Sequence, residues 1–229
     1  MTKIAILGTG IVGRTIAVKL ADLGNEVTIG TRDVANTLKK EEKDGYGNPP
    51  FKEWYTAYPQ IKLETFKKAA HNADLVLNCT GGQVSVAALE SIGEEILNDK
   101  ILIDVANPLD FSQGMPPSLS PVNTDSLAEQ IQSRFPKLKV VKSLNTMNAY
   151  LMVNPALVKG DHNVFVCGND GDAKAAVTEL LQSFGWRENL IIDLGDISNA
   201  RGTEMLLPIW LRLWNTFGTA EFNFHIQRN

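Results

Sequence analysis

The chain has 229 residues, of which 44% are hydrophobic and 21% are charged, and its formal net charge is −4. A chain of this length and composition can bury a substantial core, as one large domain or as one domain with a small appendage. Its mild acidity, with basic residues scattered along the sequence, argues against a nucleic-acid interface. No apolar run approaches the ~18 residues of a membrane span, and a first strand at Lys3 leaves no room for a signal peptide. We therefore expect a cytoplasmic protein with no nucleic-acid or membrane partner.

A glycine motif, GTGIVG at residues 8–13, directly follows the apolar run Ile4–Leu7 and opens a segment with helical periodicity. Gly8 permits the tight turn, Gly10 allows a diphosphate to approach the backbone, and Gly13 allows the helix to pack closely on the strand. The helix N-terminus then offers unpaired N–H groups to phosphates. The motif predicts a dinucleotide site, the alternative being a βα turn that binds nothing. The expected cofactor contacts here are Gly8, Thr9, Gly10, Ile11, Val12 and Gly13.

The second strand is expected at Glu26–Ile29, and its tip carries Thr31 and Arg32 in place of an acidic residue. A carboxylate at this tip would bond the ribose diol of NAD, whereas a guanidinium can grip the extra phosphate of NADP with two charge-assisted hydrogen bonds. Bonds of this kind contribute about 1.5–3 kcal/mol each. The tip therefore favours NADP(H), bound by Arg32 with support from the Thr31 hydroxyl. Asp33 leaves a ribose contact open as an alternative.

An aromatic segment follows, with four rings between Phe51 and Tyr58. Helical spacing places these rings on one face. We expect either a short helix packed on the core or on a partner subunit, or a lid whose rings stack on adenine or on a planar substrate.

Alternating strands and helices continue to about residue 142 and predict an α/β fold with a Rossmann-type, doubly wound parallel sheet. Strands are expected at 61–66, 73–80, 100–105 and 139–142, and a helix at 85–97. A long loop spans 106–123, and Thr124 or Asp125 is expected to cap the helix that follows it.

The remaining sequence predicts a small C-terminal α+β extension, so we divide the chain into an NADP-binding domain, 1–145, and a C-terminal domain, 146–229, that supplies substrate and dimer contacts. Strands are expected at 163–168 and 190–194, with a helix between them that ends at residue 184. The segment from Met205 to Phe217 is apolar almost all the way round and predicts a buried helix at a subunit interface or pocket wall, with Pro208 in its first turn or at a kink. The tail at 222–226 alternates like an edge strand.

The functional site is expected at the carboxyl ends of the parallel strands, where open α/β sheets bind their ligands. Several amides and hydroxyls fall there, although each one alone is equally typical of a helix cap or a turn. The further cofactor contacts predicted in this way are Thr80, Gly81, Ala106 and Asn107, and the predicted substrate pocket consists of Pro108, Asn145, Met147 and Asn148.

No side chain is predicted to act as a catalytic acid or base. The three histidines, His71, His162 and His225, fall away from the ligand edge, and Lys142 is the only basic residue near the nicotinamide. Hydride transfer to a flavin-like ring requires little proton handling by the protein, because close stacking of the two rings does most of the work. Cys79 and Cys167 match no metal or redox spacing, so we expect buried free thiols and no metal.

These motifs together resemble the NADP oxidoreductases that use the 8-hydroxy-5-deazaflavin coenzyme F-420, a family related to the cytosolic domain of six-transmembrane ferric reductases. The resemblance covers essentially the whole chain, and its most specific marker is DLGDISNAR at 193–201, followed by Glu204 and Pro208. It implies a homodimer, direct hydride transfer to a small-molecule acceptor, and contacts of Thr9, Thr31 and Arg32 to the 2′-phosphate. Asp33 replaces a second basic residue, and the segments 51–58 and 110–121 look like additions.

Three functions follow as hypotheses. The first is an NADPH-dependent oxidoreductase that passes hydride to a deazaflavin, a flavin or a quinone-like ring. The second is a non-catalytic NADP(H)-binding redox sensor, whose nicotinamide end would be closed by the region of Trp54. The third is a small dehydrogenase of the β-hydroxyacid type, in which Lys142 and Asn145 handle the substrate.

Overall fold

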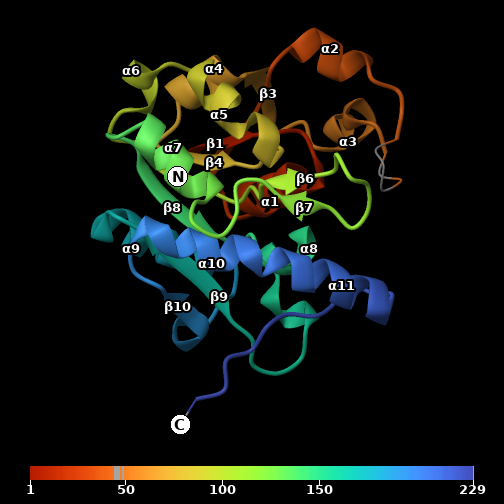
Figure 1. The fold of residues 1–229 in the computed structure, drawn as a ribbon. Helices are drawn as coiled ribbons and strands as arrows, with labels where there is room; N and C mark the ends of the chain where they lie inside the picture. The colour runs from red at the N-terminus through yellow and green to blue at the C-terminus, as the bar shows by residue number, and fades with distance from the viewer. Residues whose placement is uncertain (44–46, 48, 229) are drawn as a thin grey trace.

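The structure is a computed structural model that describes residues 1–43, 47 and 49–228. One eight-stranded sheet forms its centre, with strand order β10-β9-β8-β5-β4-β1-β2-β3, and helices cover both of its faces (Figure 1). Its strands are β1 (Lys3–Leu7), β2 (Glu26–Thr31), β3 (Lys62–Thr65), β4 (Leu75–Asn78), β5 (Ile101–Asp104), β8 (Lys139–Ser143), β9 (Val164–Gly168) and β10 (Ile191–Asp193).

The helices connect these strands in the order expected of a doubly wound fold. They are α1 (Ile11–Asp22), α2 (Val34–Lys39), α3 (Phe51–Ala57), α4 (Phe66–His71), α5 (Gly82–Glu90), α6 (Glu94–Leu97), α7 (Leu127–Arg134), α8 (Ala149–Val153), α9 (Gly171–Ser183), α10 (Ala200–Met205) and α11 (Leu207–Phe217), with short 3-10 turns at Pro155–Leu157, Glu188–Leu190 and Ile197–Asn199.

Alternation along β1 explains why both faces of the sheet are covered. Ile4 and Ile6 point into a cluster with α1, α3, α8 and α9, whereas Ala5 and Leu7 point into a second cluster with α4, α5, α6, α7 and α10. Side chains alternate between the faces of a strand, so an apolar run such as this one is stable only between two layers of helices. The α/β fold with a doubly wound, Rossmann-type sheet is therefore confirmed.

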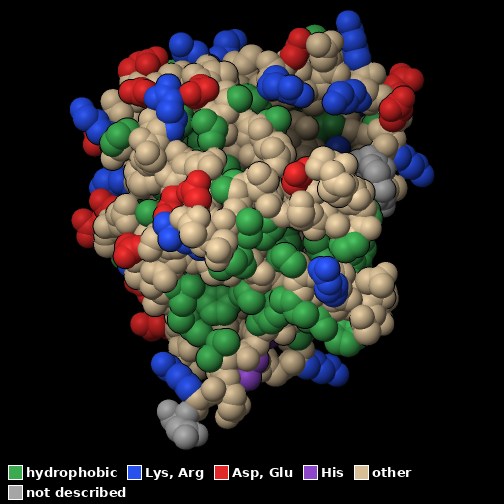
Figure 2. Space-filling view, in the orientation of Figure 1, with side chains coloured by type: hydrophobic (Ala, Val, Ile, Leu, Met, Phe, Trp, Pro, Cys, Tyr) green, Lys and Arg blue, Asp and Glu red, His purple; other side chains and the backbone are tan. Residues whose placement is uncertain are grey.

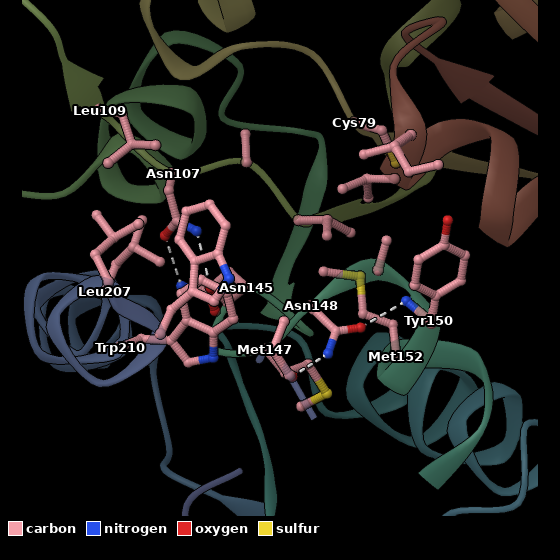
Figure 3. A pocket seen from close by; sticks show the side chains of 18 of the residues that line it. Cys79, Asn107, Leu109, Asn145, Met147, Asn148, Tyr150, Met152, Leu207 and Trp210 are labelled. Carbon is pink, nitrogen blue, oxygen red and sulfur yellow. Dashed lines mark hydrogen bonds between the residues drawn. The ribbon is translucent and has the colours of Figure 1, made fainter. Parts of the chain in front are cut away.

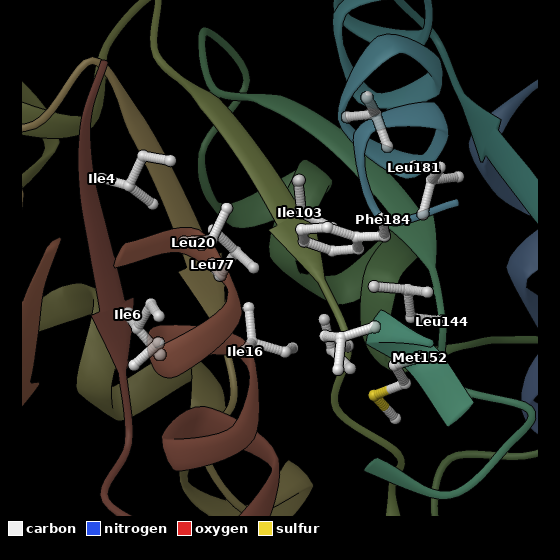
Figure 4. Close-up of a cluster of buried hydrophobic side chains, with 14 of the residues drawn as sticks. Ile4, Ile6, Ile16, Leu20, Leu77, Ile103, Leu144, Met152, Leu181 and Phe184 are labelled. Atoms are coloured by element: carbon white, nitrogen blue, oxygen red, sulfur yellow. The ribbon is translucent and has the colours of Figure 1, made fainter. Parts of the chain in front are cut away.

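The sheet is parallel from β3 to β8, but β9 pairs antiparallel with β8, and β10 then pairs parallel with β9. The predicted parallel sheet thus ends at β8, and the strands predicted for the C-terminal extension, β9 and β10, join the same sheet through one antiparallel pair. The first hydrophobic cluster also continues into the C-terminal part, where Met152, Leu181 and Phe184 meet side chains of the first half of the chain (Figure 4). Sheet and core thus run across residue 145, and the division of the chain there stays a prediction.

Several local expectations are corrected by backbone geometry. The helix expected at 85–97 begins earlier, at Gly82, and is divided into α5 and α6 by Gly93, whose φ of +100° no helix accommodates. Ser126, not Thr124 or Asp125, caps α7 by accepting a hydrogen bond from the backbone N–H of Glu129. The long loop contains a two-stranded antiparallel ribbon, β6 (Leu109–Asp110) and β7 (Ser118–Leu119).

The C-terminal tail forms no strand in the described residues up to 228; instead, single hydrogen bonds hold it beside the sheet. Asn163 N donates to Phe224 O at 2.9 Å, and Ile226 N donates to Asn163 Oδ1 at 2.7 Å. In the described ranges, no helix is long and apolar enough to cross a bilayer.

Candidate active site

The glycine turn after β1 has the geometry that each glycine was expected to supply. Gly8 has φ +121°, and a Cβ there would lie 2.4 Å from the carbonyl oxygen of Cys79. A Cβ on Gly13 would lie 2.4 Å from the carbonyl oxygen of Gly8, so this position keeps α1 close to the strand. Gly10 caps α1, and nothing lies within 4 Å of the place its Cβ would take. The backbone is therefore open to a diphosphate at Gly10 and tightly packed at the other two glycines.

A first cavity of about 740 Å³ opens at the tips of β1 and β2, where the adenosine half of a dinucleotide lies in folds of this type. Gly8, Thr9, Thr31 and Arg32 line it. Arg32 is exposed, so its guanidinium is free to turn toward a phosphate. Thr31 is buried, and its hydroxyl bonds the hydroxyl of Thr37 at 2.7 Å; the structure thus gives it a role in anchoring α2.

Asp33 caps α2 and also lines the first cavity. Its Oδ1 accepts a hydrogen bond from Asn36 N at 2.9 Å, and its Oδ2 accepts one from Asn36 Nδ2 at 2.9 Å. The helix start thus holds the carboxylate, which stays in the same cavity as the cationic Arg32. A contact of Asp33 with a ribose therefore stays a prediction.

The sequence reasoning missed two lysines of this cavity, Lys39 and Lys40. Both belong to a charged run that is most simply interpreted as a solvated helix end. Because α2 is only six residues long, the residues at its end line the same cavity as Arg32. The one local signal was their positive charge, seven and eight residues after Arg32.

A second and larger cavity, of about 1150 Å³, lies over the carboxyl ends of β4, β5 and β8. Thr80 and Gly81 line both cavities, so one groove runs from the adenosine end to this space, as an extended dinucleotide requires. The predicted residues that line the larger cavity are Ile11, Val12, Thr80, Gly81, Ala106, Asn107, Asn145, Met147 and Asn148.

Two predicted residues lie behind these walls. Gly13 is packed against the glycine turn, and Pro108 is buried with its Cα 2.7 Å from the position of a Gly82 Cβ. Neither lines either of the two cavities described above. Their contribution to binding stays a prediction, while their packing in the turns is clear.

The amides of the larger cavity are already partly engaged (Figure 3). Asn145 Nδ2 donates to Asn107 Oδ1 at 2.9 Å, and Asn107 Nδ2 donates to the Asn145 carbonyl oxygen at 2.8 Å. Asn148 caps α8, since its Oδ1 accepts hydrogen bonds from Tyr150 N and Leu151 N at 2.9 and 3.0 Å. The first two residues form a rigid amide pair beside the cavity, and the third orients a helix.

Helix α11 supplies an apolar wall opposite these amides. Leu207, Trp210, Leu211 and Trp214 line the cavity, and the two indole rings stack with centroids 6.0 Å apart and planes 28° apart. The prediction of a pocket wall agrees with this lining, while Ile209 is 46% exposed on the other side of the helix. Pro208 lies in its first turn, where a missing N–H costs nothing.

Lys142 does not reach the cavity. It is 0% exposed, and its ammonium contacts carboxylate oxygens of Asp104 and Glu204, each at 2.8 Å. Burial alone would lower the pKa of Lys142, but the two carboxylates outweigh burial and raise this pKa above its ordinary value. Lys142 is thus a permanently charged part of the core.

The aromatic helix α3 packs against the protein core. Phe51 is buried, and Trp54, Tyr55 and Tyr58 pack against the first hydrophobic cluster. The guanidinium of Arg14 lies 5.3 Å from the Phe51 ring centroid and 5.9 Å from that of Trp54. Of the two interpretations of this segment, the packed helix agrees with these contacts.

Both cysteines are free thiols. Cys167 is buried, and burial raises the pKa of its thiol to about 12, so the sulfur stays protonated at neutral pH. Cys79 lies partly buried beside the glycine turn, and burial likewise raises its pKa.

The glycine turn, the doubly wound sheet and the continuous groove at the β1–β4 switch point define a dinucleotide-binding oxidoreductase. The model of a family described as NADP oxidoreductase, coenzyme F420-dependent, matches residues 3–108. The F420-dependent NADP reductase of Methanocaldococcus jannaschii is 32% identical over 217 residues, which are 92% of each chain. The chain therefore belongs to the F420-dependent NADP reductase family, and it is an NADP-dependent oxidoreductase.

Two further comparisons agree with this assignment. A crystal structure from Arthrobacter sp. FB24, provisionally described as an F420-dependent NADP reductase, is 59% identical, covers 100% of both chains and has a TM-score of 0.95. The metalloreductase STEAP3 of Rattus norvegicus is 28% identical over 213 residues, which are 91% of this chain. The chain spans only 38% of the length of that relative. The relation to the ferric reductases is therefore confirmed only for the matched part of their length.

Proposed function

We propose that the protein transfers a hydride directly between NADP(H) and a flat flavin-type ring, either a deazaflavin or a flavin. The observation that carries this proposal is the large cavity that continues the cofactor groove past the amide pair of Asn107 and Asn145. A ring that stacks there on a nicotinamide would have Trp210 and Trp214 on its far side. Alignment of two reacting rings at contact distance supplies most of the catalysis that this reaction requires.

The acid–base chemistry available to the cavity supports the same reaction class. Of the described residues that line it, none is a histidine, lysine or arginine, and the one carboxylate among them, Glu221, is exposed. Tyr150, which the sequence reasoning missed, is 57% exposed, and Figure 3 shows its hydroxyl pointing away from the amide pair. Hydride transfer to a flavin-type ring takes its accompanying proton from water, so this lining is sufficient for it.

The proposed roles follow the groove from end to end. The glycine turn at residues 8–13 would hold the diphosphate, and Thr9, Thr31 and Arg32 the 2′-phosphate side. Thr80, Gly81, Ala106 and Asn107 would surround the nicotinamide. The acceptor side would consist of Asn145, Met147 and Asn148, with Pro108 behind them.

We also propose that the protein is a homodimer. Three exposed apolar side chains, Met205, Ile209 and Phe217, lie along α10 and α11, and apolar side chains gather over these helices in the space-filling view (Figure 2). Large contiguous apolar patches on a soluble protein mark contact surfaces more often than free ones. A second copy of the chain would cover this patch.

The two competing functions lack the features that they require. A β-hydroxyacid dehydrogenase would use Lys142 on its substrate, but this ammonium is sealed in the core. A sensor whose nicotinamide end is closed by Trp54 would need this ring at the cavity, and Trp54 packs against the hydrophobic core instead.

An isotope-transfer experiment tests whether the hydride passes directly from NADPH to the acceptor. NADPH that carries deuterium at the transferred position of C4 is incubated with the enzyme and coenzyme F420 in ordinary water. Direct transfer places the deuterium at C5 of the reduced deazaflavin, a carbon that does not exchange with solvent. Mass spectrometry of the product detects the deuterium. Riboflavin, FMN and menadione are tested as further acceptors by the rate of NADPH oxidation alone.

Two results would contradict the proposal. Loss of the label to water would show an indirect route, and the absence of NADPH oxidation with every acceptor would exclude hydride transfer to such rings. NADH serves as the matched donor, since it has the same nicotinamide and lacks the 2′-phosphate that Arg32 is proposed to bind.

A further inference from the structure

A row of buried polar side chains crosses three neighbouring strands just below the cofactor groove. Asn78 of β4 is in register with Asp104 of β5, which is in register with Lys142 of β8. All three are 0% exposed. Residues in register on adjacent strands project to the same face of a sheet, so the three side chains form one continuous row.

The ammonium of Lys142 is the centre of this row. Its three N–H groups meet three acceptors: Asp104 Oδ2 at 2.8 Å, Glu204 Oε1 at 2.8 Å, and the carbonyl oxygen of Ala106. An ammonium has three donors and no acceptor, so this group is fully satisfied. Asp104 ends β5, Ala106 lies in the turn after β5, and Glu204 lies in α10. The ammonium of Lys142 therefore joins the end of β5 and its turn to α10.

In one direction the row reaches the turn that the two cavities share. Asn78 Nδ2 donates to Asp104 Oδ1 at 2.8 Å, and Asn78 Oδ1 accepts a hydrogen bond from Thr80 Oγ1 at 2.7 Å. The backbone N–H of Ala106 also donates to Asp104 Oδ1 at 3.3 Å. Thr80 and Ala106 line the larger cavity, so both turns around the proposed nicotinamide position rest on these bonds.

In the other direction the row reaches the helices that form the apolar wall of the larger cavity, called here the acceptor wall (Leu207, Trp210, Leu211 and Trp214 of α11). Glu204 lies in α10, and its Oε2 accepts a hydrogen bond from the backbone N–H of Leu127 at 3.0 Å. Helix α11 follows α10 after Leu206 alone, and it carries Leu207 and Trp210 on the cavity side. A shift of Glu204 would therefore move the wall against which the second ring lies.

We propose that Lys142 is a positioning residue for hydride transfer: through Asp104 and Glu204 it fixes the nicotinamide turns and the acceptor wall at one separation. This inference rests on the proposed reaction, in which two rings must meet at contact distance. A displacement of about 1 Å between reacting groups can cost about a hundredfold in rate. At the adenosine end, Arg32, Lys39 and Lys40 belong to other segments than this row, and of the row's partners only Thr80 lines that cavity.

The experiment compares Lys142→Met with the wild-type protein, first by binding. We expect the Kd of NADPH to rise at least fivefold, while the Kd of 2′,5′-ADP, which has no nicotinamide, changes less than twofold; calorimetry measures both. With F420 as acceptor, kcat should fall at least tenfold. Lys174→Met is the matched control, because Lys174 pairs with Asp193 at 2.8 Å beside another part of the same sheet, and it should leave kcat and the ratio of the two Kd values unchanged.

Conservative variants separate positioning from mere stability. Glu204→Gln keeps an oxygen for Lys142 and should retain kcat within threefold, whereas Glu204→Ala should lower it as Lys142→Met does. Where Lys142→Met does not fold, Asp104→Asn tests the same link to Asn78, with the same split between NADPH and 2′,5′-ADP.

An unchanged Kd ratio and kcat in the folded variant, or equal weakening of NADPH and 2′,5′-ADP, would overturn the inference. If the wild-type protein reduces none of the acceptors, only the proposed reaction fails, and the ratio of the two Kd values still decides whether Lys142 positions the nicotinamide side.

Discussion

Arg32 stands at the tip of β2 in a cavity that also receives the ends of Lys39 and Lys40. The neighbouring acid, Asp33, is occupied by the cap of α2. The local charge at this place is therefore positive, although the chain as a whole carries a net charge of −4. Arg32, Lys39 and Lys40 outnumber Asp33 among the charged side chains that line the cavity, so a phosphate on the adenosine ribose would meet a net positive charge.

We predict that Arg32→Ala weakens NADPH binding by about ten- to a hundredfold, because charge-assisted hydrogen bonds contribute about 1.5–3 kcal/mol. NADH binding should change less than twofold, and isothermal titration calorimetry measures both affinities. Arg212→Ala, at an exposed arginine of α11, is the control and should change neither. Equal losses for the two nucleotides would show that Arg32 does not distinguish the phosphate.

Helix α11 shows how one element can serve two environments. Its face with Leu207 and Trp210 is buried against the cavity, while Ile209 and Phe217 are 46% and 56% exposed. Its composition suggested burial on every side, because apolar residues occupy both faces of the helix. Only the packing of α11 over the sheet separates the face that lines the groove from the face that points outward.

We predict that Trp214→Ala raises the KM of the flavin-type acceptor about five- to a hundredfold, since stacking on an aromatic side chain contributes about 1–3 kcal/mol. The Kd of NADPH should change less than twofold, because Trp214 lies on the acceptor side. Steady-state kinetics at saturating NADPH measure the effect. Ile209→Ala, on the outer face of the same helix, should leave this KM unchanged, and a comparable rise in the control would contradict the assignment of the two faces.

At the scale of the whole molecule, the two hydrophobic clusters bury the sheet on both sides and leave its carboxyl edge for the groove. The C-terminal strands complete the same sheet, and α10 and α11 then return across it (Figure 1). The acceptor wall is thus made by the last part of the chain and the cofactor turn by the first. The outward apolar side chains of α10 and α11 are what a second subunit would cover.

We predict that the wild-type protein sediments as a dimer and that Ile209→Glu converts it to a monomer, because a buried unpaired carboxylate is strongly unfavourable at an apolar interface. Sedimentation velocity measures the mass. Leu23→Glu introduces the same charge at another exposed apolar residue, 42% exposed at the end of α1, and should remain dimeric. A wild-type monomer, or two dimeric variants, would exclude this face as the interface.

The features that depend on neighbouring residues could be predicted from the amino-acid sequence. Gly8 and Gly13 marked the βα turn because no other residue fits their backbone and their close packing. The apolar runs of β1, β4 and β5 indicated strands, and Thr31 with Arg32 located the strand tip. These signals arise within a few residues of one another, so they can be read without knowing the fold.

Contacts between residues far apart in the chain could be found only in the tertiary structure. It sealed Lys142 between Asp104 and Glu204, reversed the chain direction at β9 and paired Asn107 with Asn145. Each of these outcomes follows from contacts whose partners are distant in sequence, and the free energy of such contacts is set by packing and burial, which no local pattern encodes.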